Sequence, residues 1–302
     1  MTPQDGPPLS ITIVMVTYAR DEMAQKAINR VREVVGERDD VEFVLVDNNP
    51  DERDRGAFIA AFPHRQYVKN KVNKGVSARS DGAAVARGDL IIFLDDDALL
   101  ERDDSLSIYE ASFAADPRLA IVGARHIDHV TGVTPREAFP HTDKSLPQDK
   151  PFKTFRFQGN AFAIRKSVYQ AVGPLPSEYF YGLEEIDYAY RIVDAGHHIL
   201  YQPEIRVVEY NDPGGRATKK HVEEMRLTNK LIITYKYMPA IYVPMNMVLF
   251  SAYVFMLNKG KINVFKSFGD FVSAVRTRGI ARAPIGREAV NYIRECGGTV
   301  WR

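Results

Sequence analysis

The chain has 302 residues, of which 45% are apolar and 26% charged, as in a globular protein of one large domain with an appendage. Its net charge of +1 gives no reason to expect a nucleic-acid partner. The single cysteine, Cys296, excludes an internal disulfide, and the first ten residues lack the basic and apolar regions of a signal peptide, so we expect a cytoplasmic protein.

The first third of the chain predicts an alternation of strands and helices. Apolar runs rich in β-branched residues predict strands over 9–18, 41–49 and 89–97. Apolar residues at helical spacing predict helices over 21–35 and 77–88. This order is typical of an α/β fold with a mainly parallel central sheet and helices on both faces.

The next part of the chain is less regular. We expect a strand around 119–127 and a mobile loop over 131–151. A strand and a helix are predicted over 157–173, and a helix ending at Gly196 with a strand after it over 182–201. No internal repeat or low-complexity tract is found.

Three of the predicted strands end in polar residues, which are Thr17-Tyr18, Asp47-Asn48-Asn49 and Asp95-Asp96-Asp97. One such cluster alone would more simply begin a turn. Ligands of parallel α/β sheets bind outside the carboxyl ends of the strands. Three clusters on one edge of a sheet therefore predict a shared polar site.

The triplet Asp95-Asp96-Asp97 places three carboxylates side by side, and like charges about 4 Å apart repel by roughly 4 kcal/mol at an effective dielectric constant of 20. A divalent cation among them would remove the repulsion, and oxygen ligands suit Mg²⁺ or Mn²⁺. The alternative is an acidic turn exposed to solvent. The four apolar residues that lead into the triplet favour the cation site.

Five segments occur in the order seen in family 2 glycosyltransferases, which the chain resembles over roughly residues 10–230. They are "IVMVTY", "LVDNN", "NKGVSARSDGAAVARGDLIIFLDDD", "GNAFAIRK" and "GLEEIDYAYR". The resemblance implies the GT-A fold, a nucleotide-diphosphate sugar donor (UDP, GDP or dTDP type) and Mn²⁺ or Mg²⁺. It also implies an inverting transfer in one displacement, to a glycan or lipid-linked acceptor.

The resemblance also implies roles for individual residues in donor and acceptor binding. The nucleotide would be bound by Thr17, Tyr18, Asp47, Lys74, Arg79, Asp95 and Asp96, with Asp47 on the base. Asp97 would bind the metal with support from Asp95, and Gly159 and Asn160 would lie beside sugar and acceptor. Two alternatives stay open: Arg79 as an exposed arginine paired with Asp81 or Asp89, and Lys74-Gly75 as a simple turn.

The segment "EEID" at 184–187 matches the family's Glu-Asp motif for the catalytic base, with Glu185 in place of the aspartate. A carboxylate is deprotonated at neutral pH and can take the proton of an acceptor hydroxyl. We expect Glu185 to be this base, with Glu184 as second choice. Acidic residues are also favoured in a helix's first turn. We read Asp187 as structural, paired with Arg191.

A histidine that many relatives carry after the following strand is missing here. Asp212 or His221 is a possible substitute as a metal ligand, or Asp97 and the phosphates serve alone. The Gly-rich basic segment 212–220 suits a loop that closes over a diphosphate. A surface loop without a role in binding would have the same composition.

The C-terminal part predicts a separate helical segment, and we divide the chain into a catalytic domain (1–230) and an appendage (231–302). The uncharged stretch 237–258 is long enough for a transmembrane helix, although a buried helical hairpin fits its prolines better. The segment 261–279 predicts an amphipathic helix, and residues 259–302 carry nine Lys/Arg against three Asp/Glu. A basic amphipathic segment predicts peripheral contact with the inner face of a membrane.

Two other functions fit parts of the sequence. A sugar nucleotidyltransferase would also combine a metal, a nucleotide and a sugar phosphate, but "TYARDEM" after the first strand lacks the Gly-rich loop expected there. A catalytically inactive, nucleotide-binding relative is compatible with Glu185 and the missing histidine.

Overall fold

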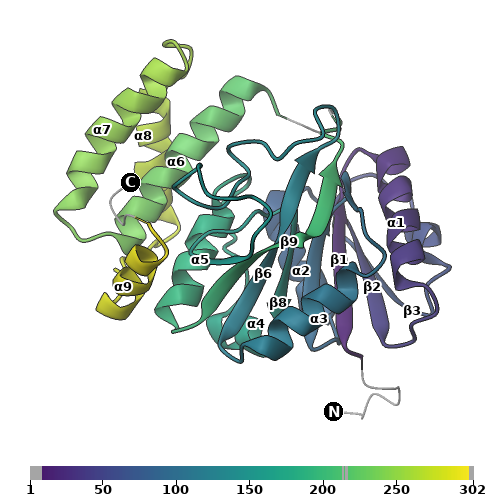
Figure 1. The fold of residues 1–302 in the computed structure, drawn as a ribbon. Coiled ribbons are helices and arrows are strands. Elements are labelled where there is room, and N and C mark those ends of the chain that lie inside the picture. The colour runs from purple at the N-terminus through teal and green to yellow at the C-terminus, as the bar shows by residue number, and fades with distance from the viewer. Residues whose placement is uncertain (1–8, 213, 215–216, 299–302) are drawn as a thin grey trace.

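The computed structural model describes residues 9–212, 214 and 217–298, and within them the chain forms a nine-stranded mixed sheet with helices on both faces (Figure 1). The strands are β1 (Ile11–Thr17), β2 (Val41–Asp47), β3 (His64–Lys69), β4 (Leu90–Asp95), β5 (Ala98–Leu100), β6 (Leu119–Asp128), β7 (Phe152–Thr154), β8 (Ala161–Arg165) and β9 (His198–Glu209). The predicted absence of a signal peptide concerns residues 1–10, of which 1–8 lie outside the described part.

The helices are α1 (Asp21–Val35), α2 (Ala78–Val85), α3 (Ser105–Ala115), α4 (Lys166–Val172), α5 (Glu184–Asp194), α6 (Lys219–Tyr237), α7 (Tyr242–Leu257), α8 (Val264–Thr277) and α9 (Arg287–Glu295). Two short 3-10 turns are η1 (Gly56–Ile59) and η2 (Gly75–Ser77). The predicted α/β class is confirmed by this order of elements.

The strand order is β3-β2-β1-β4-β8-β6-β9-β5, with β7 paired to β9. Strands β1 to β4 are parallel, whereas β8 runs antiparallel to β4 and β6. The register places Thr17 opposite Asp47 and Val16 opposite Asp95. The polar ends of β1, β2 and β4 therefore lie at one level of one sheet edge, as predicted.

Both faces of β1, β2 and β4 are buried, which explains their almost continuous apolar runs. On one face Ile11, Ile13 and Met15 pack with α1 and α3, and on the other Val14 packs with α2. A Cβ atom at Gly82 of α2 would lie 2.4 Å from Cγ1 of Val14. Glycine here lets α2 lie close to the sheet, next to the polar strand ends.

Helices α6 to α9 stand together at one end of the sheet (Figure 1). The predicted domain boundary at residue 230 falls inside α6, and Leu227, Phe271 and Ile293 belong to the same core cluster as the sheet residue Val14. At the division between 1–230 and 231–302, helix α6 is therefore continuous, and one hydrophobic core extends over both parts.

The loop predicted over 131–151 exists, but it is fastened to the C-terminal helices. Phe139 is buried, and Nε2 of His141 lies 2.8 Å from the carbonyl oxygen of Cys296. The hydroxyl of Thr142 donates to the carbonyl of Gly297 (2.6 Å). These anchors come from residues more than a hundred positions away, so nothing in the local sequence indicated them.

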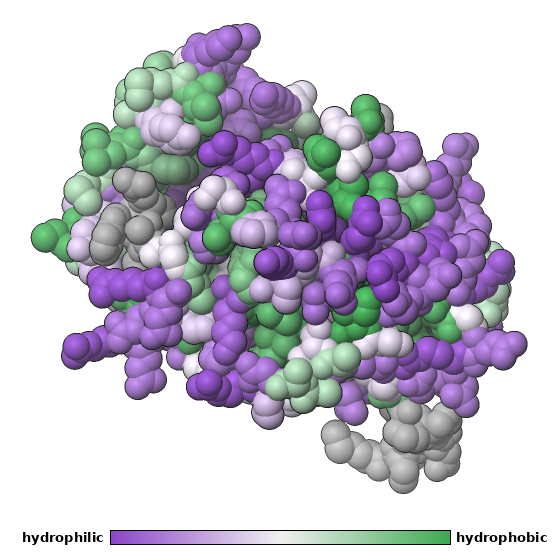
Figure 2. Space-filling model, in the orientation of Figure 1, coloured by the Kyte–Doolittle hydropathy of each residue, from purple (hydrophilic) through white to green (hydrophobic). Residues whose placement is uncertain are grey.

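The uncharged stretch 237–258 is not one helix, because α6 ends at Tyr237 and α7 begins at Tyr242. In the described part of the chain, no helix has the length and hydropathy to cross a bilayer. The alternative of a buried hairpin is also wrong, since the outer face of α7 is exposed, with Leu249 at 62% and Met256 at 69%. Figure 2 shows hydrophobic residues gathered over this part of the molecule.

Candidate active site

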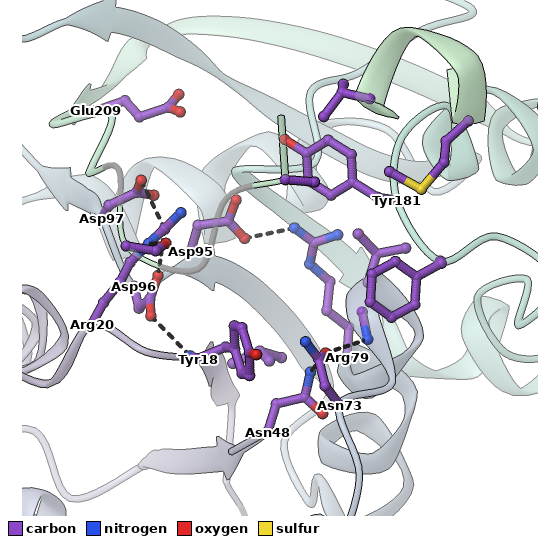
Figure 3. A pocket seen from close by; sticks show the side chains of 18 of the residues that line it. Tyr18, Arg20, Asn48, Asn73, Arg79, Asp95, Asp96, Asp97, Tyr181 and Glu209 are labelled. Atoms are coloured by element: carbon purple, nitrogen blue, oxygen red, sulfur yellow. Dashed lines mark hydrogen bonds and ion pairs between the residues drawn. The ribbon is translucent and has the colours of Figure 1, made fainter. Parts of the chain in front are cut away.

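A cavity of about 400 Å³ lies at the carboxyl ends of β1, β2 and β4. Its floor is lined by Tyr18, Asn48 and the triplet Asp95–Asp97, and Phe180 and Tyr181 line it from the loop before α5. Figure 3 shows Tyr18, Asn48 and the triplet converging on it from separate elements. We call it the first cavity. It brings together side chains from all three predicted polar clusters.

Arg20 is the counter-ion of the acidic triplet. Its Nη1 lies 3.0 Å from Asp96 Oδ1 and 2.9 Å from Asp97 Oδ2, and its Nε donates to the carbonyl of Gly214 (2.8 Å). The sequence analysis did not single out Arg20. Its position three residues beyond the end of β1, beside three acids at the end of the neighbouring β4, was the available signal.

Asp96 is buried, as Asp97 is, and accepts from the backbone N–H of Tyr18 (3.3 Å). Burial raises the pKa of Asp96 to about 7; Arg20 opposes this rise, and the charges of Asp97 and Asp95 add to it. Carboxylates whose charged form is destabilised in this way favour an additional cation. The oxygen-rich triplet therefore fits Mg²⁺ or Mn²⁺, with Asp97 and Asp95 as the residues that would hold it.

Arg79 is buried and joins two parts of the site. Its Nη2 lies 2.6 Å from Asp95 Oδ1, and its Nη1 lies 3.0 Å from Glu184 Oε1. The alternative of an exposed arginine paired with Asp81 or Asp89 is therefore wrong. α2 points Arg79 across the sheet edge, so that it neutralises one acid from β4 and one from α5.

A second cavity of about 620 Å³ adjoins the first and shares Arg79, Asp95 and Glu209 with it. Gly159, Asn160, Glu184 and Glu185 line it. The backbone N–H of Asp95 donates to the carbonyl of Asn160 (2.9 Å), which fixes β4 against the start of β8. The structure thus brings the residues expected beside sugar and acceptor next to the acidic triplet.

Glu184 and Glu185 begin α5 but differ in their surroundings. Glu184 is buried in its ion pair with Arg79, whereas Glu185 is half-buried in the wall of the second cavity. Burial and the negative charge of Glu184 raise the pKa of Glu185 above its usual range. Since Glu184 is held by Arg79, Glu185 is the better placed of the two to receive a proton.

Asp187 is fully buried and holds α5 to its neighbours. It accepts hydrogen bonds from the hydroxyls of Tyr179 and Tyr237 (2.8 Å each) and an ion pair from Lys236 (2.5 Å). The predicted pair with Arg191 is wrong, because Arg191 donates to two backbone carbonyls before α5. The partner of Asp187 comes from α6, which helical spacing within α5 does not indicate.

Three residues expected at the nucleotide do not line the first cavity, namely Thr17, Asp47 and Lys74. Thr17 is buried beneath it, and Lys74 forms an ion pair with Asp81 (2.9 Å). Gly75, in contrast, does line the cavity; a Cβ there would lie 2.0 Å from the carbonyl oxygen of Phe180. The segment after Lys74 therefore packs directly against the loop before α5.

The carboxylate of Asp47 does not line the first cavity and is instead bound by basic residues. It lies 2.9 Å from Lys69 Nζ and 3.2 Å from Arg55 Nη1, and accepts from the hydroxyl of Tyr67 (2.7 Å). Burial raises its pKa, but hydrogen bonds from Asn49, Lys69 and Tyr67 outweigh this and hold the pKa below its usual value.

The two residues considered as replacements for the missing histidine differ in their surroundings. His221 is exposed in the first turn of α6, whereas Asp212 is linked to the triplet through Arg20, with its carboxylate 3.9 Å from Nε of Arg20. Of the loop 212–220, residues 213 and 215–216 lie outside the described part. Figure 3 shows a further carboxylate, Glu209, on the same side of the cavity as Asp97. Glu209 accepts a hydrogen bond from the side-chain amide of Asn160 (3.0 Å).

No group of three or more acidic, histidine or cysteine side chains with metal-binding geometry is found among the described residues. A cation at Asp97 and Asp95 would therefore complete its ligands with water or phosphate oxygens, as Mg²⁺ usually does.

The family model "Glycosyl transferase family 2" matches residues 12–173, which is more than half of the chain. The chain belongs to glycosyl transferase family 2. The matched range contains the first cavity's strand ends and Gly159-Asn160, and it ends before α5. The roles of Glu184 and Glu185 therefore rest on the geometry and on the motif.

Among curated proteins, the pre-mycofactocin glycosyltransferases of two Mycobacterium tuberculosis strains (CDC 1551 / Oshkosh and H37Rv) are 27% identical over 154 residues. This match covers 48% of the chain and 32% of each relative. The chain thus spans about a third of the length of these relatives.

Several solved structures share the fold. GalNAc-T7 with UDP, GalNAc and Mn²⁺ has a TM-score of 0.62 at 19% identity, over 90% of this chain and 58% of that one. The mannosyltransferase PcManGT from Pyrobaculum calidifontis with GDP-Man and Mn²⁺ has a TM-score of 0.57 at 16% identity, over 98% of this chain and 88% of that one. S. aureus TarS 1–349 with UDP-GlcNAc has a TM-score of 0.60 at 13% identity, over 89% of this chain and 82% of that one. These likenesses confirm the predicted GT-A fold.

Proposed function

We propose that the protein is a metal-dependent inverting glycosyltransferase, which moves a sugar from a nucleotide diphosphate to a hydroxyl group of an acceptor. The proposal depends on the position of Arg79, which forms an ion pair with Asp95 in the first cavity and with Glu184 in the second. A donor in the first cavity and an acceptor in the second would meet at this arginine, beside Glu185.

The first cavity has the chemistry for the donor's diphosphate. Asp97 and Asp95 would hold Mn²⁺ or Mg²⁺, and such a cation would neutralise negative charge on the leaving diphosphate. Arg20 and Arg79 line the same cavity and add two cationic side chains. Tyr18 and Asn48 are in position to contact the nucleoside. Among the solved structures that share the fold, TarS 1–349 is in complex with UDP-GlcNAc and PcManGT with GDP-Man and Mn²⁺.

The second cavity supplies the base. Glu185 takes the proton of the acceptor hydroxyl while the oxygen of that hydroxyl attacks the anomeric carbon of the donor sugar. The bond from that carbon to the diphosphate oxygen breaks in the same step, and the diphosphate leaves on the side of Arg20. A single displacement of this kind inverts the anomeric configuration. Family membership favours this reaction over nucleotidyl transfer.

Nucleotide binding is the first test of the function. With Mn²⁺ present, one of UDP, GDP and dTDP is expected to raise the melting temperature, and the matching nucleotide sugar to be turned over. Ligand at a hundredfold excess over its dissociation constant stabilises a protein by about 2.7 kcal/mol. A metal-dependent shift without turnover would support the inactive relative. No shift with any of the three would overturn donor binding at this site.

The acceptor side of the proposal includes contact with a membrane surface through α7 and the turn after it. The buried side of α7 includes the polar residues Asn246 and Ser251, whereas its exposed side is apolar. Phe265 at the start of α8 is 90% exposed, and the turn between the two helices carries the exposed Lys259 and Lys261. Apolar residues next to lysines suit the interface of an anionic bilayer.

The membrane contact predicts flotation of the full chain with anionic liposomes. Leu249→Gln with Met256→Gln should lower the bound fraction, because each buried apolar side chain contributes about 1.5–3 kcal/mol. The partition coefficient should fall at least about tenfold. Val72→Gln with Val130→Gln, two exposed apolar residues elsewhere, is the control. Equal flotation of both double variants would refute the contact.

A further inference from the structure

Positive charge collects around Arg156 in the wall of the second cavity. Arg156, two residues after β7, and Lys144, in the loop 131–151, line this part. Lys230 of α6 is buried just behind it, with Nζ 5.6 Å from the centre of the Phe250 ring, and Phe250 itself lines the cavity.

These three cations lack acidic partners. No carboxylate oxygen of the described residues lies within 4.0 Å of Arg156, Lys144 or Lys230. The Nε atom of Arg156 is buried without a hydrogen-bond partner among those residues, and Lys144 Nζ donates to the carbonyl of Phe139 (2.7 Å). The other arginines of the cavity differ, since Arg79 forms an ion pair with Asp95 and Arg226 forms one with Glu223.

Burial without a partner is costly for a cation, and the three groups also act on one another. Burial lowers the pKa of Lys230 to about 8, with Arg156 adding to the effect. Burial likewise lowers the pKa of Arg156. Burial together with Arg156 and Arg136 lowers the pKa of Lys144, although the negative charge of Glu137, in the same cavity, opposes part of this fall. An anion bound between Arg156 and Lys144 would relieve all three.

Apolar residues adjoin the cations on the same wall. Phe250 and Val254 of α7 and Leu227 of α6 line the cavity beside them. From there the apolar surface continues around α7 to its exposed side, where Leu249 and Tyr253 stand in solvent. A ligand that follows this wall meets a cationic pocket first and an apolar helix next.

We infer that the second cavity takes an acceptor that is an anionic amphiphile: a phosphate group held by Arg156 and Lys144, with a hydrocarbon chain along Phe250 and Val254. The hydroxyl that receives the sugar belongs to the part of the acceptor near Glu185. This inference rests on the proposed function, since it names the class of acceptor for the same reaction. The exposed face of α7 would then meet the surface in which such a lipid resides.

Calorimetric titration of the full chain tests the inference with three probes: n-decyl phosphate below its micelle concentration, n-decanol and inorganic phosphate. Decyl phosphate is expected to bind, and each of the other two at least about tenfold more weakly. Arg156→Met and Lys144→Met should each weaken decyl phosphate at least about tenfold, because a charged hydrogen bond is lost. Arg118→Gln, an exposed arginine outside the cavity, is the control and should bind as the parent does.

A second readout separates binding from a structural role. If Arg156 is kept for a ligand, Arg156→Met should melt at the same or a higher temperature than the parent while it binds more weakly. A lower melting temperature with unchanged decyl phosphate binding would overturn the inference, as would equal binding of decanol. Equal binding of inorganic phosphate would point to a free anion and would overturn the lipid part.

The nucleotide panel keeps this inference distinct from the proposed function. A chain that binds a nucleotide diphosphate with Mn²⁺ but not decyl phosphate would retain the function and lose the acceptor class. A chain that binds decyl phosphate through Arg156 but no nucleotide would lose the function, and the cationic pocket would stand by itself.

Discussion

Replacing Glu185 by glutamine is expected to lower sugar transfer by about 10²–10⁴-fold, the usual contribution of a positioned general base. Glutamine has the same shape but cannot accept the proton of the acceptor hydroxyl. Binding of the nucleotide diphosphate should be unchanged, since Glu185 does not line the first cavity. Initial rates and nucleotide titrations of the purified variant check both parts.

The matched control for Glu185 is Glu223→Gln, which changes another glutamate of the same cavity, half-buried on α6. Its activity should stay within a few-fold of the parent. If Glu185→Gln and Glu223→Gln retained the same activity, Glu185 would not be the base. Loss in Glu184→Gln alone would move the assignment to the neighbouring residue.

The pH profile gives an independent readout for Glu185. Because burial and Glu184 raise the pKa of Glu185, the base is protonated at a higher pH than an ordinary carboxylate, and activity should fall as pH decreases through that raised value. Glu184→Gln removes the neighbouring negative charge, so the pKa of Glu185 should fall. The acidic limb of the variant's profile should therefore move to lower pH.

The parallel half of the fold could be predicted because its signals are local. The runs before Thr17, Asp47 and Asp95 are apolar and rich in β-branched residues, and they became β1, β2 and β4. Strand β3 was missed, since "HRQYVK" is polar and half-exposed at the sheet edge. The short strands β5 and β7 are defined only by pairing with β9, which lies far along the chain.

The site could be predicted at the level of strand ends but not of single side chains. Adjacent residues of a strand point to opposite sides, and the sequence does not say which side faces the ligand. Asn48 lines the first cavity, whereas the carboxylate of Asp47 turns to Arg55 and Lys69. These partners come from a segment without a clear periodic pattern, so their effect on Asp47 could not be foreseen.

Distant charges explain most of the other differences. Glu184 is held by Arg79, 105 positions earlier, and Asp187 by Lys236, 49 positions later. Local spacing offered Asp187 a partner in its own helix, but the tertiary partner is the one it has. The sequence resemblance marked Arg79 as functional, and the structure adds what it contacts.

Asp97→Asn is expected to lower transfer by about 10²–10³-fold, the usual cost of removing one electrostatic contact to a developing charge. Asparagine keeps the shape of the side chain but removes the negative charge that a divalent cation needs. The stabilisation of the protein by a nucleotide diphosphate should also lose its dependence on Mn²⁺. Melting curves with and without the metal measure this directly, without turnover.

Folding should not suffer in Asp97→Asn, because Arg20 keeps its partner Asp96 and one of three crowded negative charges is gone. The melting temperature without ligands should be the same as or above that of the parent. Asp103→Asn is the control, since it changes an exposed aspartate that pairs with Arg30 outside the cavities. If the Asp97→Asn variant kept the full Mn²⁺-dependent response, the cation would be held elsewhere, and the donor would then have to be placed without the acidic triplet.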